Sequence, residues 1–263
     1  MTNQFYTFSR ALCRIPGDSV AQGLRATGAQ DPDPALFRSE HTAYVEALID
    51  AGVSVEVLPP LEAFPDSVFI EDAALCLPEG AVVLAPGAPT RAGEADAIRA
   101  PLENHYRTVA TIQQGTIDGG DILVTDREIL VGLSERTTAE GVASLRAIVE
   151  SWSYTVTMVD TPLGVLHFKT DCGLLDGETI LATHRLAECE AFKKYHVLLV
   201  PRGEEAAANA VRVNDVVFLS AGFPKTTDLL TAAGFKVVAL PTSQAALVDG
   251  GLSCLSLRFS PNT

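Results

Sequence analysis

The chain has 263 residues, of which 47% are hydrophobic, and its formal net charge is −14. The hydrophobic fraction is typical of a globular protein and excludes a largely disordered chain. The acidic balance excludes a nucleic-acid-binding function, because a phosphate backbone would be repelled, and it would attract a cationic small substrate. No apolar run approaches the ~18 residues that span a bilayer, so no membrane partner is expected.

The cysteines indicate the cellular compartment. Five are present, at positions 13, 76, 172, 189 and 254, widely spaced and without a C-x-x-C pair. This pattern argues against a disulfide framework and a zinc cluster, and it suits a reducing environment. The segment 1–14 lacks the charged-then-apolar layout of an export signal. We therefore expect a cytoplasmic protein.

One unit recurs five times along the chain, and it contains a strand, a polar turn, a helix and a return strand. Opening strands are predicted at residues 81–85, 128–132, 179–183 and 215–220. Helices are predicted at 34–51, 92–106 (kinked or interrupted at Pro101), after the capping-box pattern of 137–140, at 187–194 and at 226–233. Return strands are predicted to begin near residues 53, 108, 155, 196 and 236.

The repeat is compatible with two architectures. Units of this size cannot each bury an apolar face alone, so they must stack or close into a ring. A closed ring leaves no exposed terminal unit and brings the segments between units to its centre. An open α/β sheet is the commoner arrangement of alternating strands and helices. From the repeat alone, the open sheet is favoured.

Polar residues concentrate in the junctions between units. Asp66, Glu71 and Asp72 lie within seven residues, among apolar neighbours. Like charges in such a setting cost stability unless a cation is present, although a solvated loop is the simpler interpretation. The next junction contains Asp118 in an Asp-Gly-Gly-Asp sequence, for which an ordinary turn is the simpler interpretation.

Two further junctions contain candidate catalytic groups. His167 lies among apolar neighbours and is by itself more typical of a core histidine. Cys254 follows the Gly250–Gly251 pair, and by itself it is more typical of a buried small hydrophobe. The strand predicted at residues 255–259 has one apolar face, which leaves Cys254 on the other face.

Arg91 and Arg136 occupy parallel places in the repeat, just after an opening strand. Either one alone is typical of a surface charge. Together, in an acidic chain, they could clamp a substrate carboxylate by bidentate pairing.

Taken together, these segments are similar to the dimethylarginine dimethylaminohydrolase family of the guanidine-modifying (pentein) superfamily. The matching segments are residues 66–72, 86–91, 117–121, 131–137, 166–169 and 248–254, in the family's order. The resemblance implies a five-bladed α/β propeller with the site at its centre, in place of the open sheet. It also implies one catalytic domain over residues 1–263, without the added helical domain of the longer arginine deiminases.

The same resemblance implies a role for each matching residue. Cys254 would be the nucleophile, His167 the general acid and base, and Asp118 the third catalytic residue. The implied substrate contacts divide into three groups. They are Asp66, Glu71 and Asp72 at the guanidinium or α-amino end, Arg91 and Arg136 near the carboxylate, and Leu24 and Val248 as lid and backbone contacts.

The implied reaction is hydrolysis of Nω-methylated arginine to citrulline and a methylamine through a covalent cysteine intermediate, without a metal or organic cofactor. Alternatives are a hydrolase or amidinotransferase acting on arginine or another guanidine, and a non-catalytic propeller that binds arginine-like cations. The implied protein is a monomer or homodimer. The carboxylates around Cys254 should disfavour its thiolate until a cationic substrate binds.

Overall fold

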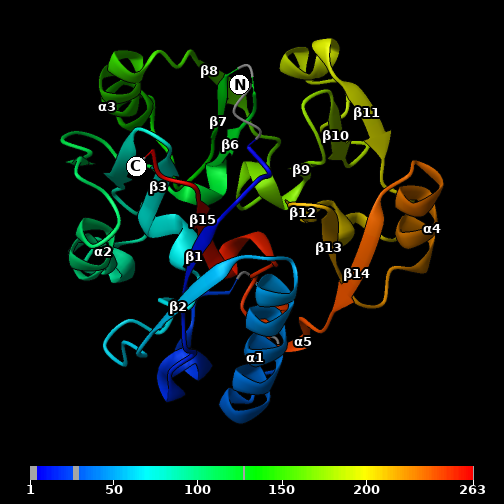
Figure 1. Cartoon of the computed structure of the whole chain (residues 1–263), viewed down its shortest axis with the longest axis horizontal. Coiled ribbons are helices and arrows are strands. Elements are labelled where there is room, and N and C mark those ends of the chain that lie inside the picture. The colour runs from blue at the N-terminus through cyan, green and yellow to red at the C-terminus, as the bar shows by residue number, and fades with distance from the viewer. Residues whose placement is uncertain (1–4, 26–29, 127, 263) are drawn as a thin grey trace.

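The computed structural model describes residues 5–25, 30–126 and 128–262. Residues 1–4, part of the segment examined for an export signal, lie outside them. Among the described residues, five three-stranded sheets are arranged around a common centre, with helices towards the outside (Figure 1). No described helix has the length and apolar character needed to cross a membrane. The closed arrangement replaces the open sheet that the repeat alone favoured.

All five sheets have the same topology. The middle strand pairs antiparallel with an inner strand and parallel with an outer strand. In chain order, the sheets after the first contain β3 (Ala74–Leu77), β4 (Gly80–Val83) and β5 (Val109–Thr111); β6 (Ile122–Val124), β7 (Ile129–Leu133) and β8 (Val156–Asp160); β9 (Cys172–Leu174), β10 (Thr179–Ala182) and β11 (His196–Leu199); and β12 (Val211–Val213), β13 (Val216–Ser220) and β14 (Lys236–Leu240).

The first sheet closes the ring because it joins the two ends of the chain. It contains β15 (Ser256–Phe259), β1 (Arg10–Arg14) and β2 (Ser54–Leu58) in that order. Leu12 of β1 lies opposite Leu257 of β15 in an antiparallel pair. This sheet therefore forms only when the strands from both ends of the chain, β1 and β15, pair with each other.

Burial explains why the strands form where the sequence predicts them. The middle strands β4, β10 and β13 are buried along their whole length, which is why they read as continuous apolar runs. The outer strands β2 and β14 have exposed and half-buried positions, since they form the rim. The outer strands begin at residues 54, 109, 156, 196 and 236, within one residue of the predicted return strands.

Within the described residues, an α-helix lies between the middle strand and the outer strand of every sheet except the one that contains β10 and β11. These helices are α1 (Pro34–Asp50), α2 (Glu94–Glu103), α3 (Ala139–Val149) and α4 (Pro224–Ala232), and a short α5 (Ser243–Ala246) precedes the last junction. The sequence predicts the start of α1 correctly: the Asp33 carboxylate caps the helix by accepting from the Ala35 and Leu36 amides. On its buried face α1 packs Phe37, Tyr44 and Leu48 into the core.

Three helix predictions need correction. Residues 190–194 form a 3₁₀ helix, η7 (Glu190–Lys194), and no α-helix covers the described residues 187–194. Pro101 lies inside α2, which continues to Glu103 and is not interrupted there; the alternative, a kink at Pro101, stays a prediction. The N-cap of α3 is Thr138, whose hydroxyl accepts from the Gly141 amide, because Thr137 instead donates to the Asp121 carboxylate.

A short 3₁₀ helix precedes every inner strand and forms the junction between sheets. These helices are η2 (Ile70–Ala73), η4 (Gly119–Asp121), η6 (Phe168–Thr170), η8 (Glu205–Ala208) and η9 (Ser253–Leu255). Contacts link η2 to both η4 and η9, η4 to η6, and η6 to η8. The junctions therefore meet at the centre. Cys254 lies in η9, ahead of β15, and not on the polar face of that strand as predicted.

Candidate active site

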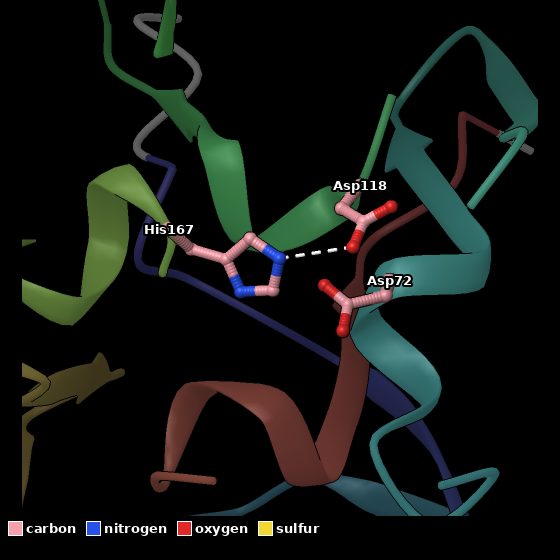
Figure 2. A group of neighbouring side chains, drawn as sticks. All are labelled: Asp72, Asp118 and His167. Carbon is pink, nitrogen blue, oxygen red and sulfur yellow. Dashed lines mark hydrogen bonds and ion pairs between the residues drawn. The ribbon is translucent and has the colours of Figure 1, made fainter. Parts of the chain in front are cut away.

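His167, Asp118 and Asp72 come from three successive junctions and converge on one point (Figure 2). His167 is the N-cap residue of η6, and Asp118 is the N-cap residue of η4. The His167 Nε2 atom lies 2.9 Å from the Asp118 Oδ2 atom, and both side chains are buried. A histidine whose ring is held by a buried carboxylate has the arrangement of a general acid or base.

Glycines make this convergence possible. A Cβ atom on Gly120 would lie 2.5 Å from the His167 Nδ1 atom and 3.0 Å from the Asp72 Oδ1 atom. The Gly87 amide donates to the second oxygen of Asp118 at 2.7 Å, and a Cβ on Gly87 would lie 2.2 Å from the backbone oxygen of Arg136. Both positions therefore require glycine for close packing.

Three carboxylates hold a proton on His167. Burial by itself would lower the pKa of the imidazole, but Asp72, Asp118 and Asp121 outweigh it and raise the pKa to about 9. At neutral pH the ring is therefore a cation that can donate a proton to a leaving amine.

Asp72 is fixed from both sides by protein donors. The Gly120 amide donates to its Oδ1 atom at 2.8 Å, and an Arg91 N–H donates to its Oδ2 atom at 2.5 Å. Burial would raise the pKa of Asp72, but His167 and Arg91 lower it to about 2. Asp72 therefore stays a carboxylate near the imidazole at all pH values of interest.

Arg91 is almost saturated with acceptors. Its guanidinium forms two bonds to Glu94, at 3.0 and 2.8 Å, one to Asp72, and one to the Phe69 backbone oxygen at 2.9 Å. A further N–H reaches the Asp66 backbone oxygen at 3.3 Å. Arginine has five N–H donors. Three of these bonds share the two N–H groups of the Nη2 atom, so at most one donor, on the Nη1 atom, is left for a ligand. These contacts favour a role in orienting Asp72 over an open carboxylate clamp.

Cys254 is partly exposed at the pocket, and its environment favours the thiol. Burial of the sulfur raises the pKa to about 12, with further contributions from the negative charges of Glu71 and Asp72. The positive charge of Lys169 opposes them only in part. This direction agrees with the expectation from the sequence that the carboxylates around Cys254 disfavour its thiolate.

Glu71 faces a different side of the junction from Asp72. Its Oε1 atom accepts from Lys169 at 2.6 Å and from Arg258 at 3.0 Å. Its Oε2 atom is buried with no hydrogen-bond partner among the described residues. Glu71 lines a cavity with Lys169 and Arg258 that is separate from the pocket containing His167.

The other nine residues that the sequence selects line a single small pocket. They are Leu24, Asp66, Asp72, Arg91, Asp118, Arg136, His167, Val248 and Cys254. The structure thus brings together side chains that are up to 230 positions apart in the chain, from Leu24 to Cys254. Glu71 is the selected residue that lies outside the lining.

One side of this pocket is less tightly paired than the Arg91 side. The Leu24 amide donates to the Asp66 Oδ1 atom at 2.9 Å, and burial raises the pKa of Asp66 despite the nearby arginines. The Arg136 side chain is half-buried, and within the described part of the chain its guanidinium has no hydrogen bond or ion pair. Arg136 is therefore available to bind an anionic group.

The donor set of Asp72, Asp118 and His167 could also be read as a metal site, since one atom of each lies within 4.8 Å of the others. The contacts fit hydrogen bonding better. His167 Nε2 is turned to Asp118, and both Asp72 oxygens already accept from protein N–H groups, one of them a cationic guanidinium. A metal ion would have to displace one of these donors, whereas each carboxylate oxygen keeps a second lone pair that can accept from a further N–H group.

Sequence reasoning missed several residues of the site. Four further residues line the pocket, and all of them lie within the segments that match the family: Phe69, Leu166, Asp249 and Gly250. Asp121 is fully buried beneath it. Its carboxylate accepts from Ser134 and Thr137 hydroxyls and from the Phe168 amide, next to His167. Its place in the Asp-Gly-Gly-Asp sequence was a usable signal.

Comparison with known proteins agrees with this geometry. A family model described as "N,N dimethylarginine dimethylhydrolase, eukaryotic" matches residues 29–171. The N(G),N(G)-dimethylarginine dimethylaminohydrolase of Pseudomonas aeruginosa is 35% identical over 254 residues, which cover 96% of this chain and 100% of that protein. A second one, from Streptomyces coelicolor, is 31% identical and covers 95% of this chain and 96% of its own.

The fold agrees as well. A crystal structure of the Pseudomonas aeruginosa enzyme, a cysteine-to-serine mutant complexed with citrulline, matches with a TM-score of 0.94 over 97% of this chain and 100% of that chain. The five-sheet ring and its central pocket define a guanidine-modifying propeller of the pentein superfamily. Within that superfamily, the chain belongs to the dimethylarginine dimethylaminohydrolase family.

Proposed function

We propose that the protein hydrolyses Nω-methylated L-arginine to L-citrulline and a methylamine. The observation that carries this proposal is one pocket lined by a thiol, a histidine held by a carboxylate, a second carboxylate and an available arginine: Cys254, His167 with Asp118, Asp72 and Arg136. This set supplies a nucleophile, a proton donor, a partner for the guanidinium and a partner for the substrate carboxylate.

Binding prepares the first step. The guanidinium carbon is a poor electrophile, so its orientation and the stabilisation of charge on its nitrogens matter most. Asp72 is held as an anion by Arg91 and is suited to bind the guanidinium. A bound cation would lower the pKa of the Cys254 thiol, since an opposite charge within ~4–6 Å lowers a pKa by ~1–3 units.

The covalent step then follows from the two central side chains. With the cation bound, the Cys254 thiol loses its proton to solvent, because His167 is already protonated. The thiolate forms a bond to the guanidinium carbon, and the resulting tetrahedral adduct breaks its bond to the methylated nitrogen. Protonated His167 gives its proton to that nitrogen, and the methylamine departs. What remains is an S-alkylthiouronium ester of Cys254 and a neutral imidazole.

Hydrolysis reverses the roles. Neutral His167 takes a proton from a water molecule as the water oxygen bonds to the same carbon. The C–S bond breaks, the Cys254 sulfur leaves with its electron pair, and the hydroxyl proton that is lost as citrulline forms returns the sulfur to the thiol. Asp118 holds the imidazole in one orientation through both steps. Asp118 and Asp72 stabilise the imidazolium, which keeps the proton available for the next turnover.

Relatives support the proposal from their own chemistry. One solved structure of a dimethylarginine dimethylaminohydrolase is an adduct with S-methyl-L-thiocitrulline, formed in a variant with glycine in place of a histidine, and it is 35% identical to this chain with a TM-score of 0.93 over 96% of it. The citrulline complex of the Pseudomonas aeruginosa protein is the second case. By analogy we assign the same substrate class here.

Three further assignments belong to the proposal. We propose that residues 1–263 act as one catalytic domain, because the first sheet needs both chain ends. We propose a cytoplasmic location, since the functional thiol Cys254 needs a reducing environment. A monomer or homodimer is proposed, as the family resemblance implies.

Citrulline release from dimethylarginine, monomethylarginine and plain arginine tests the proposal. We expect turnover of at least one methylated arginine and none by a Cys254→Ser variant. Turnover of arginine alone would favour the alternative hydrolase. Binding of all three without citrulline release would favour a non-catalytic cation-binding propeller. Transfer of the amidino group to an added amine would favour an amidinotransferase.

A further inference from the structure

The junction between the fourth and fifth sheets contains an asparagine, Asn209, whose side-chain amide contacts the residues next to the catalytic groups. Asn209, the C-cap residue of η8, donates from its Nδ2 atom to the Ser253 hydroxyl at 2.9 Å and accepts at Oδ1 from the Ser253 backbone amide at 3.0 Å. Ser253 is the residue before Cys254. The backbone on the N-terminal side of the nucleophile is thereby fixed by two hydrogen bonds to one side chain.

The same amide also holds the histidine junction. The Nδ2 atom of Asn209 donates to the Lys169 backbone oxygen at 2.9 Å. Lys169 lies in η6, two residues after His167. One side-chain amide therefore joins the turn that contains Cys254 to the turn that contains His167. All three of its available groups, two N–H donors and one oxygen, are used in this connection.

The position of the Asn209 amide explains why Gly251, the second residue of the Gly250–Gly251 pair, is a glycine. A Cβ atom on Gly251 would lie 2.5 Å from the Asn209 Oδ1 atom and 2.7 Å from its Cγ atom. Any larger residue at 251 would push the amide off Ser253. The first glycine has a different reason, because a Cβ on Gly250 would lie 2.2 Å from the Phe69 ring.

Cys254 and His167 belong to different sheets, and no hydrogen bond joins their side chains among the described residues. Their relative position depends on how the junctions are tied together. We propose that Asn209 is a positioning residue that fixes the Cys254 sulfur relative to His167, through Ser253 and Lys169. The proposal rests on the proposed function, because it assigns Asn209 to the alignment of that reaction.

The test compares Asn209→Ala with a matched control, Asn214, which lies on the other side of the same strand, β12. Asn214 also makes three hydrogen bonds, to the Phe8 amide, the Phe8 oxygen and the Ala51 oxygen, but it lies outside the cavity that Asn209 lines together with His167 and Cys254. Since its φ is 52°, glycine is the replacement that avoids backbone strain. Asn214→Gly therefore removes an equivalent set of bonds at a distance from the chemistry.

For Asn209→Ala we expect kcat to fall about 10²-fold, the size associated with a misplacement of about 1 Å. KM should change less than about threefold, because the groups that bind the substrate stay in place. Alkylation of Cys254 by neutral iodoacetamide should continue at the wild-type rate, since that reaction needs no His167. A kcat loss no larger than that of Asn214→Gly, or a loss confined to KM, would overturn the proposal.

A double-mutant cycle with Gly251→Ala sharpens the test. Gly251→Ala alone should lower kcat by displacing the amide, and once Asn209 is alanine the same substitution should have a much smaller effect. Additive losses would overturn the proposal, since they would mean that the two residues act separately. Ser253→Ala, which keeps the backbone bond to Oδ1, should lose less than either and provides a well-folded intermediate case.

A crystal structure of Asn209→Ala gives a measure that does not depend on turnover. We expect the Cys254 sulfur to move by more than about 0.5 Å relative to the His167 ring, which is the tolerance of a preorganised site. An unmoved sulfur would overturn the proposal even if the wild-type protein released no citrulline. Absence of wild-type turnover together with a displaced sulfur would count against the proposed function alone.

Discussion

Two walls of the central pocket differ in how their charges are balanced. The paired wall consists of Asp72, Arg91, Asp118 and His167, with Glu94 behind Arg91; all five are buried and bonded to one another or to the backbone. The open wall consists of Leu24, Asp66, Arg136 and Val248, where Arg136 has no ion pair within the described residues.

The comparison shows that equivalent places in a sequence repeat need not have equivalent roles. Arg91 and Arg136 both follow an opening strand. The Arg91 guanidinium is bonded to Asp72 and Glu94, whereas the Arg136 guanidinium remains available to a ligand. The neighbours of a charge decide what it can bind. We infer that the paired wall performs the chemistry and that the open wall recognises the amino-acid end of the substrate.

The largest expected effect is on the stability of the paired wall. Arg91→Ala would leave Asp72 and Glu94 as uncompensated buried carboxylates, which typically costs about 3–5 kcal/mol of unfolding free energy. Denaturant unfolding measures it. The control is Arg38→Ala, which removes an exposed pair with Asp18 and should cost at most about 1 kcal/mol. Equal losses in the two variants would contradict the distinction between the walls.

The next effect is on catalysis within the paired wall. Asp118→Asn keeps the shape of the side chain but removes the charge that holds the imidazolium, and we expect kcat to fall about 10²–10⁴-fold. Glu204→Gln is a suitable control, because Glu204 is also buried and caps α4 through Thr226. An Asp118→Asn variant with wild-type kcat would show that Asp118 only packs.

The same variant has a pH signature. The pKa of His167 is raised to about 9 in the folded protein, above the ~6.5 of an unfolded chain. The linked stability is therefore fully present below about pH 6.5 and is lost as pH rises through 9, at about 1.4 kcal/mol per unit of pKa difference. Asp118→Asn should flatten this decline and lower the imidazole pKa measured by NMR. An unchanged pKa would contradict the account.

On the open wall the expected effect is on binding. Arg136→Ala should raise KM about tenfold or more, since a charge-assisted hydrogen bond contributes about 1.5–3 kcal/mol. The kcat value should stay close to wild type, and the unfolding free energy should change by less than about 0.5 kcal/mol. Agmatine-like guanidines that lack a carboxylate should bind wild type and Arg136→Ala equally. A stability loss as large as that of Arg91→Ala would remove the difference between the walls.

The smallest effect is a shift in titration, with no loss of function. Because burial, Glu71 and Asp72 raise the pKa of Cys254 to about 12, thiolate absorbance should show no Cys254 ionisation near pH 7. A non-reactive guanidine should shift that ionisation to lower pH by about 1–3 units, because it adds a positive charge beside the thiol. Subtracting the Cys254→Ser spectrum removes the other cysteines. An apo pKa well below 7 would contradict the prediction.

The sequence predicted the parts of the fold that repeat with a strong apolar pattern. Middle strands such as β7 were located because their buried apolar runs stand out, and outer strands such as β8 because they contain several β-branched residues close together. The inner strands β9 and β12 were missed, since each has three residues and too few side chains to form a pattern. Ring closure came from the family resemblance, because open and closed arrangements bury the same strand faces.

For the site, the sequence likewise indicated some of the residues and not others. The repeat marked His167 and Cys254 as junction residues, and the family resemblance then implied their roles. The pairing of Arg91 with Glu94 could not be foreseen, since it depends on the start of α2. Asn209 was invisible because a lone amide in a loop has no distinctive spacing.

The central claim is that Cys254 forms a covalent intermediate with a guanidine substrate. Rapid acid quench of the protein with dimethylarginine, followed by mass spectrometry of its peptides, tests it most directly. We expect a mass increase equal to the substrate minus dimethylamine on the peptide that contains Cys254, and none in Cys254→Ser. Citrulline release without any such increase, or an increase on another cysteine, would contradict the account.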